Sequence, residues 1–178
     1  MSPDHASSVR PLARPQTLLV AAIGLALASI AGAWFFELAL GYTPCKLCLL
    51  QRWPYYLGLP VGLAAWLAGG SRTGLGRMLI VLFVLIFIIS AGMGAYHAGV
   101  EWKFWAGPTD CAGKLVDGPA SVLDLRKSLA TTRVIRCDDA ALRVLGLSFA
   151  GWNVLVSLAV AGLAWAARRP QGSSTLSQ

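Results

Sequence analysis

The amino-acid sequence predicts an all-α membrane protein, a bundle of four transmembrane helices with both termini on the cytoplasmic side and two loops on the outer side. Two observations lead to this fold class. Apolar residues make up 56% of the 178 residues and charged residues only 13%, whereas soluble domains carry about 25% charged residues. The apolar residues are also gathered into four continuous blocks without barrel-like alternation. Because lipid offers no partner to backbone polar groups, such blocks are expected to be helical.

Each block is assigned to one helix by its length. A spanning helix needs about 20 apolar residues, and the blocks at residues 17–36, 78–97 and 145–167 reach this length directly. The second helix, predicted over residues 49–68, is marginal. The first block is longer than the roughly 7–15 apolar residues of a cleaved signal peptide, so we expect it to remain in the chain. Tails at 1–16 and 168–178 and outer loops at 37–48 and 98–144 complete the predicted organisation.

Basic residues set the predicted orientation. They crowd close to the helix ends in three short segments, which a four-helix chain places on one side, and the positive-inside rule makes that side cytoplasmic. The residues concerned are Arg10, Arg14, Arg72, Arg77, Arg168 and Arg169. The longer loop at 98–144 carries a comparable number of basic residues, so the density near the helix ends decides. The net charge of +7 then reflects basic membrane flanks, and no nucleic-acid partner is expected.

The four cysteines, Cys45, Cys48, Cys111 and Cys137, all fall in the two predicted outer loops. An even set confined to the oxidising side indicates disulfide chemistry and supports the chosen orientation. A C-x-x-C pair such as Cys45 and Cys48 typically contains a thiol of lowered pKa and an exchangeable disulfide. The distant pair, Cys111 and Cys137, suits either a structural bridge or an exchanging one. Zinc sites usually present two closely spaced pairs, so no metal site is predicted.

Arg52 is the second unusual feature, because a cation at the edge of a membrane helix is costly and is often functional. If the helix begins within the C-x-x-C motif, Cys48 lies near its positive end and Arg52 lies one turn further on. Both effects favour a thiolate at Cys48. Arg52 also suits a polar, electron-accepting ligand dissolved in the bilayer, or lipid headgroups. His97 suits a ligand carbonyl or a helix cap, and Glu37 suits an interfacial position or a proton site.

These features together resemble the disulfide bond formation protein B family, the quinone-dependent thiol oxidases of bacterial inner membranes. The resemblance rests on PCKLCLLQR at residues 44–52, YHAGVEWKFWAGPTDC at residues 96–111, Cys137, and the four predicted helices. It covers roughly residues 17–167. Gln51 stands where an acidic residue can occur in the family.

The resemblance implies a function as a protein-dithiol:quinone oxidoreductase with its cysteines facing the periplasm. The disulfide between Cys111 and Cys137 would be attacked by a reduced periplasmic DsbA-like partner, with Cys111 forming the mixed disulfide. Electrons would then pass through a bridge between Cys137 and Cys45. Cys48 would be released as a thiolate towards ubiquinone or menaquinone, with Arg52 stabilising it and His97 at the same site. The implied partners are this thiol oxidant, the membrane quinone pool and the lipid bilayer.

Two other interpretations remain open on the sequence. A vitamin K epoxide reductase-like enzyme also couples thiols to a quinone in four helices, but its C-x-x-C lies near the last helix, whereas here it follows the first. A non-enzymatic four-helix membrane protein with structural disulfides would have inert bridges and would tolerate replacement of Arg52. The response to Arg52→Ala therefore separates this last interpretation from the oxidase.

Overall fold

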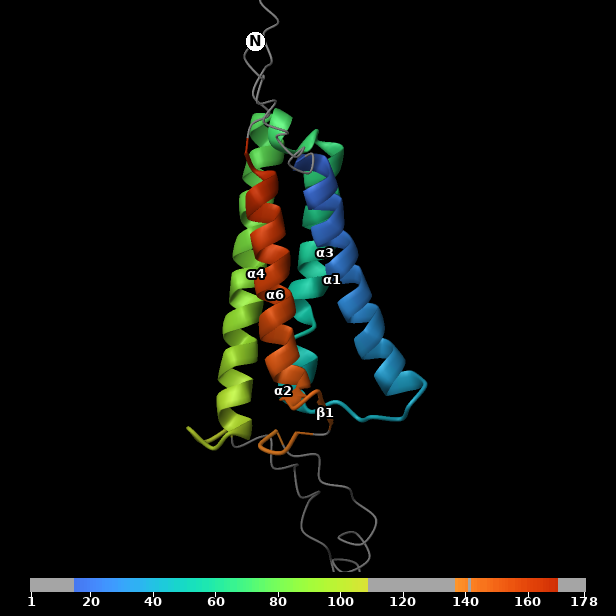
Figure 1. Ribbon diagram of the computed structural model, residues 1–178, viewed down its shortest axis with the longest axis vertical. Helices are drawn as coiled ribbons and strands as arrows, with labels where there is room; N and C mark the ends of the chain where they lie inside the picture. Colours follow the sequence, from blue (N-terminus) through green and yellow to red (C-terminus); the bar gives the residue numbers. More distant parts are fainter. Residues whose placement is uncertain (1–14, 109–136, 141, 170–178) are drawn as a thin grey trace, which may run out of the picture.

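A computed structural model of the chain describes residues 15–108, 137–140 and 142–169. Cys111 and most of the two predicted tails lie outside these residues. Four long helices lie side by side along the long axis of the molecule (Figure 1). They are α1 (Pro15–Leu38), α3 (Trp53–Leu67), α4 (Gly74–Glu101) and α6 (Phe149–Ala167). The C-terminal half of α1 diverges from the other helices (Figure 1).

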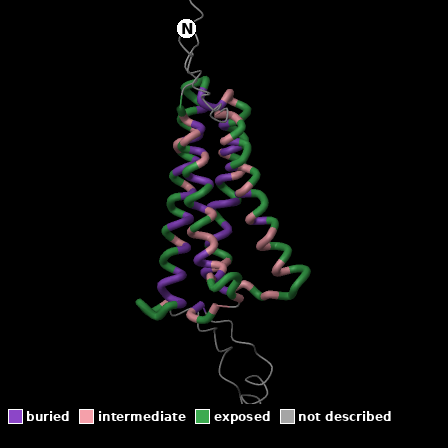
Figure 2. Tube along the Cα trace, in the orientation of Figure 1, coloured by how far each residue is buried: buried purple, intermediate pink, exposed green. Residues whose placement is uncertain are grey.

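Three of the described helices, α1, α4 and α6, are long and apolar enough to cross a membrane. α3 has 15 residues and falls short of that length by itself. Large apolar side chains are exposed on the outer faces of the bundle, among them Leu27, Leu85 and Leu158, and the exposed positions follow the outside of the helices (Figure 2). Such a surface suits lipid rather than water.

The second predicted helix is divided into α2 (Lys46–Leu50) and α3. Proline has no backbone N–H and disfavours helical geometry in the residue before it, so Pro54 suits the first turn of a new helix. Pro54 indeed occupies the first turn of α3, and Arg52 is the residue that precedes the helix. The backbone N–H of Arg52 bonds three residues back, to Leu49 O at 3.2 Å. Gln51 and Arg52 therefore form a tightened turn between α2 and α3.

The core of the bundle combines aromatic rings with small residues. Phe83 and Phe87 of α4 are fully buried, and they lie directly against Gly58 and Gly62 of α3. A Cβ added at Gly62 would lie 2.8 Å from a ring carbon of Phe83. Small residues thus let α3 and α4 approach closely, as is common between membrane helices.

A polar network ties α3, α4 and α6 together next to this core. The Tyr55 hydroxyl donates to Asn153 Oδ1 at 2.7 Å, and Asn153 Nδ2 donates to the backbone oxygen of Ser90 at 3.2 Å. Ser157 Oγ donates to Ser90 Oγ at 2.9 Å. Interhelical hydrogen bonds of this kind fix how helices face each other in an apolar medium.

The remaining elements close the two ends of the bundle. At one end, η1 (Gly70–Arg72) joins α3 to α4. At the other, β1 (Arg143–Val144) pairs antiparallel with β2 (Leu147–Ser148) in a small hairpin, whose turn residues Leu145 and Gly146 both have positive φ. That pattern is typical of a type I′ turn. Because of this hairpin, α6 begins at Phe149 rather than at the predicted residue 145, and Ser148 caps it by accepting from Gly151 N.

Candidate active site

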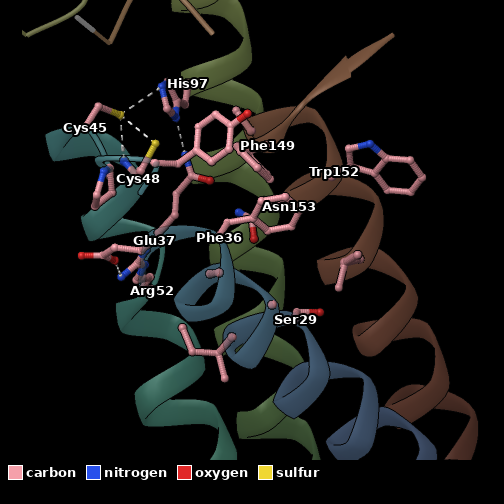
Figure 3. A pocket seen from close by; sticks show the side chains of 18 of the residues that line it. Ser29, Phe36, Glu37, Cys45, Cys48, Arg52, His97, Phe149, Trp152 and Asn153 are labelled. Atoms are coloured by element: carbon pink, nitrogen blue, oxygen red, sulfur yellow. Dashed lines mark hydrogen bonds and ion pairs between the residues drawn. The ribbon is translucent and has the colours of Figure 1, made fainter. Parts of the chain in front are cut away.

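A cavity of about 290 Å³ lies at the cysteine-bearing end of the bundle, between α1 and the other helices. Its wall is partly apolar, with the Phe36 and Phe149 rings edge to face at 5.0 Å. Polar groups line the opposite part, and Figure 3 shows several of them pointing into the same space. They include Glu37, Cys45, Cys48, Gln51, Arg52, His97, Glu101, Asp139 and Asn153. Cys45, Cys48, Arg52 and His97, all predicted from the sequence, thus share one cavity.

The cysteine pair is held by the first turn of α2. Cys45 is the N-cap residue, and its sulfur accepts a hydrogen bond from Cys48 N at 3.2 Å. Both cysteines are free thiols, and their sulfur atoms lie 2.8 Å apart. His97 Nε2 lies 3.7 Å from the Cys45 sulfur on the other side (Figure 3). Three groups therefore converge on the Cys45 sulfur.

These contacts favour the thiolate at Cys45 rather than at Cys48 in the reduced pair. The hydrogen bond with Cys48 lowers the pKa of Cys45 to about 5, with a further contribution from His97 and against the opposing effect of burial. The same sulfur–sulfur hydrogen bond, together with burial, raises the pKa of Cys48. The sequence predicted the thiolate at Cys48 because that residue would lie near the start of a helix that begins within the motif. The helix does begin there, at Lys46, but the Cys45 sulfur at the N-cap receives the hydrogen bond from Cys48 N and the contact with His97, which the sequence did not indicate.

The pH dependence of alkylation checks this assignment. In a chain with Cys111→Ser and Cys137→Ser, the alkylation rate of Cys45 is expected to fall as the pH drops through about 5, rather than through the ordinary thiol value of 9.0. The reason is that only the thiolate reacts, and it is protonated below its pKa. Mass spectrometry of the Cys45 peptide gives the rate. Cys48→Ala removes the strongest hydrogen bond, so the midpoint should rise; an unchanged midpoint would contradict the assignment.

His97 connects the cysteine pair to the end of α4. Its Nδ1 accepts from Gln51 Nε2 at 2.7 Å, and its ring also interacts with the backbone of Cys137. Glu101 lies one turn further along α4, with Oε1 at 3.8 Å from His97 Nε2. Both side chains are almost fully buried. Sequence reasoning named neither Glu101 nor Gln51 as a site residue, although the i, i+4 spacing of His97 and Glu101 on one helix places them on one face.

Arg52 lies in the cavity but faces α1 rather than Cys48. Its Nη1 donates to Glu37 Oε2 at 2.5 Å, and its guanidinium carbon lies 5.2 Å from the centre of the Trp34 ring. Within the residues that the structure describes, no hydrogen bond joins Arg52 to Cys48. The expected contact one turn along a helix assumed a continuous helix, and the break between α2 and α3 removes that relation. Glu37 thus belongs to the site as the partner of Arg52.

Cys137, in the segment between α4 and β1, also lies at the site. It is disulfide-bonded, almost fully buried, and packed in one cluster with Cys45 and Leu47. Lys103, just beyond α4, donates to the backbone oxygen of the next residue, Asp138, at 2.8 Å. These contacts hold the segment at 137–140 beside the C-x-x-C pair. Cys111, which was predicted to act with Cys137, lies outside the described residues.

A helical membrane bundle with a reactive thiol pair at one end, next to a second cysteine engaged in a disulfide, defines a membrane thiol oxidoreductase. Comparison with known proteins specifies the class further. The family model described as "Disulfide bond formation protein DsbB" matches residues 14–167. The chain therefore belongs to the disulfide bond formation protein B family. It is accordingly a bacterial multi-pass membrane protein with a thiol oxidase role in disulfide formation.

Individual relatives agree with this assignment. Disulfide bond formation protein B of Marinobacter nauticus is 33% identical over 131 residues, which cover 71% of this chain and 75% of the relative. The protein of the same name from Nitrosomonas europaea is 31% identical over 166 residues, covering 88% of this chain and 96% of the relative. Disulfide bond formation protein B 1 of Pseudomonas fluorescens is 31% identical over 153 residues, covering 84% and 86%. No solved structure matches the chain.

Proposed function

We propose that this protein oxidises the dithiol of a periplasmic DsbA-like protein and delivers the electrons to a membrane quinone, either ubiquinone or menaquinone. The observation that carries the proposal is that the free thiols of Cys45 and Cys48 line the same cavity as Arg52 and His97. A thiol pair that merely stabilised a loop would need no such cavity. DsbA-type disulfides are strong oxidants, at about −120 mV, so regenerating them requires a stronger acceptor than glutathione. A quinone is such an acceptor.

The residues of the cavity suit a quinone ring. Quinones have an apolar ring with carbonyl oxygens, and the cavity offers the Phe36 and Phe149 rings together with the Arg52 and His97 side chains. Its volume of about 290 Å³ is close to the lower end of the roughly 300–1,000 Å³ of small-molecule sites. We infer that Arg52 and His97 bind the carbonyl oxygens and that Cys48 faces the ring. The bound quinone would supply the two-electron acceptor.

The proposed electron path uses the four cysteines as two pairs. The partner's thiolate attacks the disulfide between Cys111 and Cys137 at Cys111, which leaves a mixed disulfide and a thiolate at Cys137. The partner's second thiol then displaces Cys111, so the partner leaves oxidised and this pair is reduced. With the C-x-x-C pair oxidised, the Cys137 thiolate attacks its disulfide at Cys45 and releases Cys48 as a thiolate. The Cys111 thiolate then displaces Cys45, which restores the disulfide between Cys111 and Cys137 and leaves Cys45 and Cys48 reduced; oxidation of this pair by quinone completes the cycle. The packing of Cys137 and Cys45 in one cluster supports the exchange between them.

The hydrogen bond between the two sulfur atoms suggests how the order of steps is kept. While Cys45 is a free thiolate, its hydrogen bond is the main cause of the raised pKa of Cys48. A disulfide at Cys45 would remove that negative charge and free Cys48 to ionise. Cys48 would therefore become nucleophilic only after Cys45 has been engaged. This order would protect the quinone site from premature reaction.

We further propose that residues 49–68, the end of α2 together with α3, form the fourth membrane span and that the cysteines face the periplasm of a bacterial inner membrane. α3 lies beside the three membrane-length helices (Figure 1), and α2 continues towards the cysteine end. Arg72, Arg77, Arg168 and Arg169 lie near η1, the start of α4 and the end of α6, at the opposite end of the bundle. The positive-inside rule makes that end cytoplasmic.

The test is quinone reduction, followed by absorbance, in membranes that contain this protein and a reduced DsbA-like protein. Turnover that requires both the partner and quinone is expected. A mixed disulfide trapped between the partner and Cys111 would identify the entry point. No turnover and no trapped species with any DsbA-like partner would favour a structural role for the disulfides. Turnover with a trapped species at Cys45 or Cys48 instead would favour chemistry closer to that of vitamin K epoxide reductase.

Arg52→Met is expected to raise the KM for quinone about 10-fold, because a charge-assisted hydrogen bond contributes about 1.5–3 kcal/mol. Glu37→Gln is the matched control, since either change breaks the same ion pair but only Arg52→Met removes the cation. Steady-state kinetics at varied quinone concentration give the KM of both variants. Equal KM increases in the two variants would assign the effect to the ion pair and contradict a direct contact between Arg52 and quinone.

A further inference from the structure

The reduced cysteine pair and His97 of α4 bring together three side chains that can bind a metal ion. The sulfur atoms of Cys45 and Cys48 and the ring nitrogen of His97 all lie within 4.8 Å of one another. We propose that these three residues, with Glu101 as fourth ligand, form a binding site for a thiophilic divalent metal ion, zinc in the first instance. The site exists only while Cys45 and Cys48 are reduced. This inference goes beyond the proposed function and needs no quinone.

Glu101 is the observation that points to a ligand. Its side chain is only 5% exposed, and within the described residues its Oε2 is buried without a hydrogen-bond partner. A buried carboxylate oxygen without a partner is costly, and native proteins rarely leave one. The other oxygen, Oε1, lies 3.8 Å from His97 Nε2, so the carboxylate lies at the edge of this cluster and would move towards the sulfur atoms to complete the site. A cation there would satisfy it.

The distances fit a tetrahedral site after a small movement. Zinc binds thiolate sulfur at about 2.3 Å and histidine nitrogen at about 2.0–2.1 Å, which separates neighbouring ligand atoms by about 3.5–3.8 Å in a tetrahedron. The Cys45 sulfur already lies 3.7 Å from His97 Nε2. The two sulfur atoms, at 2.8 Å, would have to part by about 1 Å. Two sulfurs, one imidazole and one carboxylate favour zinc over magnesium or calcium.

Gln51 would determine which ring nitrogen of His97 carries the proton. As the side chains lie, Gln51 Nε2 donates to His97 Nδ1, so the ring proton is on Nε2 and points at the Cys45 sulfur. Metal binding needs the lone pair of Nε2, which places the proton on Nδ1. Rotation of the Gln51 amide by half a turn presents its oxygen to that proton. Gln51 would thus orient the ligand, as outer-shell partners commonly do at zinc sites.

Metal and disulfide would exclude each other at this pair. Binding of the ion releases the proton of the Cys48 thiol and engages a lone pair on each sulfur, with no change in oxidation state. A metal-bound pair could not pass its electrons to quinone, and an oxidised pair could not bind the metal. Zinc is therefore expected to inhibit the oxidase by capturing its reduced form.

The experiment uses cobalt as an optical probe with the full chain in detergent micelles. Cys111→Ser and Cys137→Ser leave Cys45 and Cys48 as the only thiols. One equivalent of Co²⁺ is expected to produce a thiolate-to-cobalt charge-transfer band in the near ultraviolet, and Zn²⁺ should abolish it. Glu101→Gln is expected to weaken Co²⁺ binding at least about 10-fold. Glu37→Gln, which changes another carboxylate of the same cavity, should leave the affinity unchanged.

Three results would overturn the proposal: no charge-transfer band at one equivalent, an equal band after the pair has been oxidised, or equal affinities in Glu101→Gln and the unaltered chain. Should the double serine variant fail to fold, the same titration applies to the wild-type chain before and after oxidation of Cys45 and Cys48, where a difference of one ion is expected. Because the readout is optical and contains neither quinone nor partner, its failure would leave the quinone proposal unaffected.

Discussion

Cys48→Ser is expected to abolish quinone reduction completely while leaving the first thiol exchange intact. A serine hydroxyl does not ionise in the range in which a thiol does, so it cannot take the place of the Cys48 thiolate. The disulfide at Cys137 can still be attacked by the partner. The variant should therefore oxidise about one equivalent of partner dithiol and then stop, because one exchange consumes one disulfide.

The measurement combines two signals from one sample. Quinone absorbance follows the second half of the reaction, and thiol labelling of the partner follows the first. Loss of both signals would indicate a folding defect, which a loss of helical circular dichroism would confirm. Continued turnover at more than a small fraction of the wild-type rate would contradict the role of Cys48. Cys45→Ser should also stop quinone reduction, since it removes the acceptor of electrons from Cys137.

Gly32→Phe is expected to lower kcat/KM for quinone at least about 100-fold, since displacement of a reactant by about 1 Å can cost that much. Gly32 lies on α1 and lines the cavity of about 290 Å³. No atom lies within 4 Å of a Cβ placed there, so the new ring can enter without disturbing the backbone. It would then occupy the space assigned to quinone.

Gly24→Phe is the matched control on the same helix. A Cβ at Gly24 also meets nothing within 4 Å, but this residue is exposed on the outer face and does not line the cavity. Both variants replace a helical glycine with the same ring, so changes in helix propensity cancel. A quinone kcat/KM reduced equally in both would show that the ring acts through the stability of α1 rather than through the cavity.

The membrane-length helices were predictable because hydropathy and length determine them. Residues 17–36 and 78–97 fall within α1 and α4, both of which reach membrane length. α4 nevertheless continues one turn past residue 97, because Glu101 is buried against protein rather than exposed to lipid or water. The hydropathy of a segment reports its transfer into lipid and not its burial between helices.

The candidate site was predictable in its residues but less so in its pairings. Cys45, Cys48, Arg52 and His97 were recognisable by type and spacing, and all four line one cavity. The pairing of Arg52 with Glu37 was not predictable, because a continuous helix would have placed Arg52 next to Cys48, and the helix is interrupted before Trp53. The thiolate position depends on the contacts of the Cys45 sulfur with Cys48 and His97, and the contact with His97, 52 residues away in the sequence, could not be predicted from the C-x-x-C motif. Glu101 could be recognised as a site residue only once α4 was known to extend to residue 101.

The shortness of α2 has a consequence for how the thiol pair can move. A helix of five residues is far below the roughly 12–15 residues at which an isolated helix becomes even marginally stable. It persists because Leu47 and Cys45 are buried beside Cys137. Segments held in this way open locally at a fraction of the free energy needed to unfold the whole protein. The redox pair therefore lies on a separately releasable unit, which can be displaced while α3, α4 and α6 keep their hydrogen-bonded register.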